Sequence, residues 1–168
     1  MKGFGNKSYS KKTSKKCKYK NPSKEKIINQ AYKFASQGNL LEAEKCYKLF
    51  LKKGFVDARV SMNLAQIFFK DGRLNEAEQS LKKAIEIKPD FPEAHYNLGI
   101  ILKDLDKLEE AELSYRKAIE IKPDIAEAYY NLGIILRDLD KLEEAELSYR
   151  KAIEIKPDYA KAHYNLGI

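Results

Sequence analysis

The residues of this chain that are best suited to holding a ligand by hydrogen bonds are five asparagines that recur every 34 residues. An asparagine amide offers both donors and an acceptor, so it can bond the backbone of an extended peptide without reading its side chains. The regular spacing predicts an evenly stepped ladder of amides. The five are Asn29, Asn63, Asn97, Asn131 and Asn165.

Other residues with chemical potential do not form a catalytic or metal-binding pattern. His95 and His163 occupy equivalent positions two repeats apart, which favours packing residues over ligands. The run Asp104-Leu105-Asp106 lacks the glycine and the ligand spacing of a calcium loop. No glycine-rich phosphate loop and no nucleophile beside a base is recognisable. Because a repeated pattern does not provide the unique constellation that catalysis needs, we predict that this chain is no enzyme and takes no cofactor or metal.

The asparagines belong to a longer repeat that begins at residue 24. In each unit, apolar residues recur at helical three-and-four spacing, stop at a turn and then start again, which predicts a pair of helices. Such units bury their apolar faces only against their neighbours, so the sequence predicts an all-α solenoid of antiparallel helix pairs. The units are 24–57, 58–91, 92–125 and 126–159, with a partial unit at 160–168.

Two local patterns predict how the helices end and begin. Gly38 and Gly72 stand where the first helix of a unit should end, and Asp106 takes that place in the third unit. Glycine suits the left-handed residue that ends a helix, and aspartate tolerates that conformation at some cost. Asp124 with Glu127 three residues later forms a capping-box pattern, which predicts that Asp124 caps the next helix.

The repeat resembles the tetratricopeptide repeat family, which has an early Leu-Gly, a large residue three positions on, then alanine, an aromatic residue and a late proline. The first unit diverges most, with Phe55 where proline is expected. The resemblance implies a right-handed superhelical solenoid. The matching residues of the third unit are Leu98, Gly99, Leu102, Ala111, Tyr115 and Pro123.

In this family the first helix of each pair lines a concave groove, and the resemblance places the asparagine ladder there. The Asn-Leu-Gly and Lys-Pro-Asp runs are also similar to the repeat region of O-linked N-acetylglucosamine transferases, which carries such a ladder. The terminal-carboxylate clamp of chaperone-binding members is missing, since Ile28, Tyr32, Glu93 and Asn97 occupy its positions. The other groove residues that the resemblance implies are Tyr96, Tyr130, Ile100, Ile134, Lys103 and Arg137.

We therefore predict a protein-protein interaction scaffold that binds an extended peptide or a protein surface in the groove. The alternative is the substrate-recruiting front of a larger glycosyl-, methyl- or sulfotransferase that continues beyond Ile168, since the fifth unit stops before its first turn. For the asparagines themselves a second interpretation stays open. The amides could face solvent, or bond a neighbouring helix, and have been copied by duplication.

Charge separates the first residues from the repeats. Residues 1–23 hold eight lysines and no acid, whereas the whole chain has a formal charge of +7. We predict a basic disordered arm with weak contact to RNA, the ribosome or an anionic surface, and a nearly neutral repeat region with no reason to bind nucleic acid along its length. Cys17 and Cys46 suggest no disulfide framework. No run is apolar enough to span a membrane or to act as a secretory signal, and we expect a cytoplasmic protein.

Overall fold

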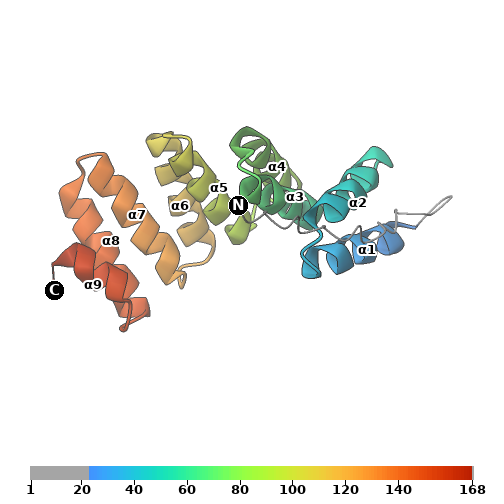
Figure 1. Cartoon of the computed structure of the whole chain (residues 1–168). Helices are drawn as coiled ribbons and strands as arrows, with labels where there is room; N and C mark the ends of the chain where they lie inside the picture. Colours follow the sequence, from blue (N-terminus) through green and yellow to red (C-terminus); the bar gives the residue numbers. More distant parts are fainter. Residues whose placement is uncertain (1–22, 168) are drawn as a thin grey trace, which may run out of the picture.

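The computed structural model describes residues 23–167, and this part of the chain forms nine α-helices and no strand. Figure 1 shows the helices as a row of antiparallel pairs, running from α1 in blue to α9 in red. The predicted all-α solenoid is confirmed. The predicted disordered arm, apart from Ser23, lies outside the described residues. The helices are α1 (Lys24–Ser36), α2 (Leu40–Lys52), α3 (Ala58–Lys70), α4 (Leu74–Ile87), α5 (Pro92–Asp104), α6 (Leu108–Ile121), α7 (Ala126–Asp138), α8 (Leu142–Ile155) and α9 (Ala160–Leu166).

Each helix packs mainly against the helix before it and the helix after it. One alanine near the start of each second helix is buried, which allows the paired helix to approach closely; these are Ala43, Ala77, Ala111 and Ala145. The junction between α2 and α3 is the least extensive of these neighbour contacts. The hydrophobic core therefore extends continuously along the row of described helices and is not concentrated at one centre.

The turns within the helix pairs have the left-handed residue that the sequence predicts. Gly38 and Gly72 both have φ of 72°, and Asp106 has φ of 59° at the equivalent position. In the third repeat, the N–H of Lys107 donates to the carbonyl of Leu102 at 2.8 Å, which closes the end of α5. Asp106 thus adopts the left-handed conformation that glycine adopts in the first two repeats.

The capping-box prediction is wrong. The residue in the cap position of α7 is Ile125, and no side chain caps this helix. Asp124 lies one residue too early, in the turn that follows Pro123. The N–H of Ala128 instead donates to the backbone carbonyl of Ile125 at 3.0 Å. The backbone therefore satisfies a donor that the sequence pattern assigned to a carboxylate.

Candidate functional site

The five predicted ladder asparagines lie at the same position in the first helix of each repeat, in α1, α3, α5, α7 and α9. Asn29 is exposed, and the other four are half-buried. A half-buried amide is partly withdrawn from water, so its hydrogen-bond partners matter energetically.

Three of the five amides donate to a tyrosine hydroxyl of the preceding repeat. The Nδ2 atom of Asn131 lies 3.2 Å from Tyr96 Oη, and that of Asn165 lies 3.4 Å from Tyr130 Oη. Asn63 Nδ2 lies 3.2 Å from the hydroxyl of Tyr47, which comes from α2. Bonding to a neighbouring helix, the interpretation left open by the sequence, therefore holds for these three.

Two of the tyrosines that accept these bonds, Tyr47 and Tyr96, have a raised pKa and stay protonated over the physiological range. Burial raises the pKa of Tyr47 to about 12, and burial likewise raises the pKa of Tyr96. The rings also contact one another at their edges, with 5.9 Å between the centroids of Tyr96 and Tyr115. A joint of this kind combines an amide–hydroxyl bond with an edge contact between rings, so its own side chains use the amide donor.

The joint around Asn97 is built differently. Met62 stands where Tyr96 and Tyr130 stand in the later repeats, and Leu81 takes the place of Tyr47 and Tyr115. Neither side chain can accept a hydrogen bond from the amide as a hydroxyl does. Within the described residues, the side chain of Asn97 forms no hydrogen bond to another residue.

Three hollows on the described part of the chain are each lined by one ladder asparagine. The first lies between α1 and α3 and includes Asn63, and the second lies between α3 and α5 and includes Asn97. A further hollow beside α7 and α9 includes Asn165 together with the predicted residue Arg137. Asn131 of the fourth repeat lines none of these three hollows, so the series is interrupted at the joint between α5 and α7.

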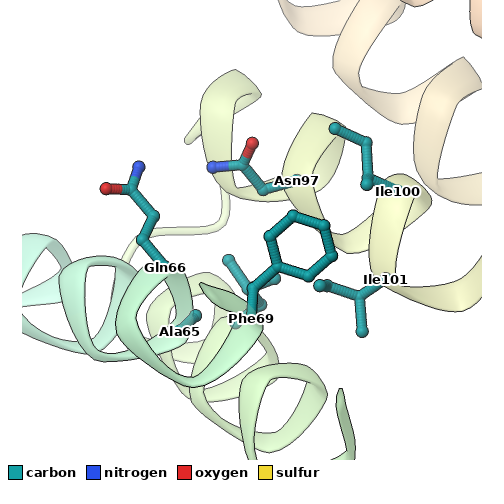
Figure 2. Close-up of a pocket in the computed structure, with 7 residues that line it drawn as sticks. Ala65, Gln66, Phe69, Asn97, Ile100 and Ile101 are labelled. Carbon is teal, nitrogen blue, oxygen red and sulfur yellow. The ribbon is translucent and has the colours of Figure 1, made fainter. Parts of the chain in front are cut away.

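Figure 2 shows the hollow between α3 and α5. The ring of Phe69 lies at its centre, with Ile100 and Ile101 of α5 beside it, and the amides of Gln66 and Asn97 lie at its upper edge. No charged residue lines it, and its volume is about 60 Å³. This hollow combines an apolar floor with two amides at the rim.

The remaining predicted groove residues are only partly brought together. Ile134 is half-buried and packs on the core, without lining any of these hollows. Lys103 is exposed, and it forms no ion pair with the residues that the structure describes. Arg137 pairs with its neighbour Asp138, with 3.2 Å between Nη2 and Oδ1. The two predicted basic residues, Lys103 and Arg137, are thus not equivalent in their contacts.

Sequence reasoning missed a second ladder, which joins the outer helices of successive repeats. Each of its glutamates is buried on a second helix and accepts from a cation 29 residues later. The pairs are Glu44 with Arg73 at 2.8 Å, Glu78 with Lys107 at 2.7 Å and Glu112 with Lys141 at 2.7 Å. The recurring 29-residue offset between acid and base could have revealed them.

The outer carboxylates are held in their charged form. Hydrogen bonds from Lys107 and then Lys82 keep the pKa of Glu78 below its ordinary value. For Glu112, burial acts in the opposite direction, but the bonds from Lys141 and Arg116 outweigh it and lower the pKa. These ion pairs tie one repeat to the next on the side away from the asparagines.

The two histidines have structural partners. His95 Nε2 lies 2.9 Å from the carbonyl oxygen of Pro89, and His163 Nε2 lies 2.8 Å from that of Pro157. Each ring therefore braces the turn before its helix. Among residues 23–167, no group of three or more histidine, cysteine, aspartate or glutamate side chains is placed to hold a metal ion. None of the helices described is both long enough and apolar enough to cross a bilayer.

Comparison with known proteins places this geometry in a family. The solved structure of MamA is 28% identical with a TM-score of 0.78, covering 82% of this chain and 80% of that one. The first repeat domain of Spaghetti (RPAP3), solved with an HSP90 peptide, is 27% identical with a TM-score of 0.64, covering 66% and 87%. YrrB, described as having an unusual peptide-binding site, is 23% identical with a TM-score of 0.78, covering 87% and 75%.

A search of curated protein sequences found no match. The family models do match: a model of the TPR repeat covers residues 65–106, and the tetratricopeptide repeat model covers residues 92–125 and 126–159. Together these matches run from residue 65 to residue 159, which is more than half of the chain. The similarity to the transferase repeat region in particular stays a prediction. The chain belongs to the tetratricopeptide repeat family.

Proposed function

We propose that this protein is an interaction scaffold that binds an extended peptide along the groove formed by α1, α3, α5, α7 and α9. The observation that carries the proposal is the series of hollows, each with a ladder asparagine at its edge. Neighbouring helices pack about 8 to 10 Å apart, and three residues of extended chain span about 10 Å. Hollows at two neighbouring joints, such as those beside Asn63 and Asn97, therefore suit ligand side chains about three residues apart.

Two similar structures support a peptide ligand. The RPAP3 domain was solved with a peptide of HSP90, and YrrB is described by its peptide-binding site. In this chain the amide of Asn97 remains available for a peptide backbone, whereas Asn131 and Asn165 are already engaged by tyrosines. We therefore place the main contact near α3 and α5. The cytoplasmic location and the RNA or ribosome contact of the basic arm stay predictions.

The transferase alternative gains no support from these comparisons. MamA, the RPAP3 domain and YrrB match this chain through their repeats. The contacts described above are those of a binding surface, with amides and apolar walls. We therefore keep the scaffold as the proposed function.

The experiment is a selection of random twelve-residue peptides, displayed on phage, against the full chain. Selected peptides are then synthesised and titrated by fluorescence anisotropy. The groove variant is Gln66→Trp, because Gln66 is exposed and lines two neighbouring hollows. The matched control is Gln79→Trp, an exposed glutamine of the same repeat on the outer helix α4.

We expect Gln66→Trp to weaken binding of the selected peptides by about tenfold, equivalent to about 1.4 kcal/mol. Gln79→Trp should leave the affinity unchanged, and both variants should keep the helical circular dichroism spectrum. Peptides that bind the Gln66→Trp protein as tightly as the original chain would overturn the groove as the binding surface. The same conclusion follows if only Gln79→Trp weakens them.

A further inference from the structure

The joint between the second and third repeats lacks the tyrosine–asparagine bond that is present at the other joints. In the third repeat, a Cβ on Gly99 would lie 2.7 Å from the ring of Tyr115, so the glycine makes room for that ring. The fourth repeat has the same arrangement, with 2.6 Å between a Cβ on Gly133 and Tyr149. Glycine and tyrosine form a matched pair in both repeats.

The second repeat has Ala65 and Leu81 at these two positions, and both line the hollow below Asn97. Alanine adds a methyl group, but leucine removes the phenol ring and its hydroxyl. At this joint the exchange is accompanied by an apolar hollow of about 60 Å³. Together with Met62 in the position of Tyr96, Leu81 leaves the Asn97 amide without the tyrosine partner that Asn63, Asn131 and Asn165 each have.

From this hollow we infer a specificity pocket, which takes a branched aliphatic side chain of the bound peptide. The inference rests on the proposed function and adds the chemistry of the ligand. A cavity that accepts benzene measures about 150 Å³, so the smaller hollow of about 60 Å³ favours the tip of valine or leucine over an aromatic ring. Phe69 provides a wall with 39% of its surface exposed, which an aliphatic group would cover.

The neighbouring hollow adds a charge requirement. It lies on the other side of α3 and shares Gln66 with the aliphatic pocket. Lys70 is the charged residue among those that line it, and Lys70 makes no ion pair within residues 23–167. A carboxylate of the peptide complements this ammonium group.

The expected ligand is therefore an extended peptide with a branched aliphatic residue and an acidic residue three positions apart. The spacing follows from the distance of about 8 to 10 Å between neighbouring helices and about 10 Å per three extended residues. Gln66 and Asn97, at the rim of the pocket, can bond the peptide backbone between the two side chains.

The test closes the pocket with residues that the protein already uses. In the full chain, Ala65→Gly with Leu81→Tyr reproduces the pair found at Gly99 and Tyr115. A second variant, Phe69→Lys, removes the aromatic wall and installs the residue found at the equivalent position, Lys103. Thermal melting followed by circular dichroism checks that both variants fold, and Lys70→Gln tests the charged side.

The probes are the dodecapeptides selected against the original chain. We expect them to be enriched in valine, leucine or isoleucine three positions from aspartate or glutamate. Changing the aliphatic residue to serine should weaken binding about tenfold, as expected for losing a buried side chain of this size. Both pocket variants should weaken the original peptide by a similar factor and remove the effect of the serine change. Lys70→Gln should weaken only peptides that carry the acid.

Two outcomes separate this inference from the proposed function. If groove-dependent peptides show no aliphatic enrichment, or if closing the pocket leaves their affinity unchanged, the pocket is wrong and the scaffold stands. If no selected peptide depends on Gln66, both fail. Enrichment of phenylalanine or tyrosine at the same place would also overturn the assignment, because the inference assigns the pocket to an aliphatic side chain.

Discussion

Two neighbouring joints are built from equivalent helices but from different side chains. One lies between the second and third repeats, and the other lies between the third and fourth. At the later joint, Tyr96 holds the amide of Asn131 and Tyr115 fills the space beside Gly99. At the earlier joint, methionine and leucine replace the tyrosines, leaving an apolar hollow and an unpaired amide at Asn97. A repeat can thus keep its backbone while two substitutions turn a sealed contact into an open one.

The same contrast suggests how an array of near-identical units acquires a specific site. Hydroxyls and rings that bond across a joint stabilise the stack but use up the groups that a ligand needs. A joint without them gives up some internal stability and offers its amide and its apolar walls to a partner. We expect stability and binding to be distributed unequally along this row of helices.

The largest expected effect comes from breaking the sealed joint. Tyr115→Leu removes a fully buried ring and should lower the free energy of unfolding by about 2 to 3 kcal/mol. Gly99→Ala alone should cost about 1 kcal/mol, because the added methyl clashes with the ring while alanine favours the helix.

Together the two changes recreate the pair found at Ala65 and Leu81. In the Tyr115→Leu background, Gly99→Ala should therefore not lower the free energy of unfolding further. It should restore part of the stability that Tyr115→Leu removes. Urea denaturation of the single and double variants measures this coupling. Costs that simply add would mean that the ring and the glycine are not a matched pair.

Much of this architecture could be predicted from the sequence, and the reasons are local. The period of the apolar residues defines the helix pairs, and the left-handed turn at Asp106 follows from its equivalence to Gly38 and Gly72. The capping prediction at Asp124 was wrong because it depended on the residue at which α7 begins. The cap position is Ile125, and a shift of one residue removes the aspartate cap.

The candidate site was less predictable. The position of Asn131 follows from the period, but its partner Tyr96 lies 35 residues earlier and meets it only when the repeats nest. The hollow near Asn97 arises from what Leu81 lacks, and a missing ring is visible only in three dimensions. The outer pairs, such as Glu78 with Lys107, could have been found from their constant spacing.

A smaller effect on stability is expected from the outer ion pairs, which also differ in burial and in partners from one repeat to the next. Glu78 is buried and bonds two lysines, whereas Glu146 is half-exposed and bonds Arg150 of its own helix. Glu78→Gln should cost about 1 kcal/mol at neutral pH, and Glu146→Gln close to zero. Urea midpoints of the two variants provide the comparison, and equal losses would contradict it.

The pH dependence of the same pair sharpens this expectation. Because the pKa of Glu78 is lower in the folded chain than its ordinary value of 4.5, its contribution is complete above that value. The contribution is lost as the pH falls through the lower, folded pKa. The stability of the original chain should therefore approach that of Glu78→Gln in acid. A difference that stays constant from neutral to acidic pH would show that the carboxylate charge does not stabilise the joint.

The smallest expected effect on stability distinguishes an asparagine that bonds a tyrosine, Asn131, from one that does not, Asn97. Asn131→Ala removes a half-buried hydrogen bond to Tyr96 and should lower the free energy of unfolding by about 0.5 kcal/mol or slightly more. Asn97→Ala removes no bond to another described residue, so its cost should be close to zero, as for the exposed Asn29→Ala control. Peptide affinity should show the reverse order, because Asn97 alone of this pair has its amide available. Asn131→Ala could instead weaken peptide binding more than Asn97→Ala. That result would show that the bond to Tyr96 does not prevent the Asn131 amide from binding the peptide. The difference between the two joints would then affect stability but not peptide recognition.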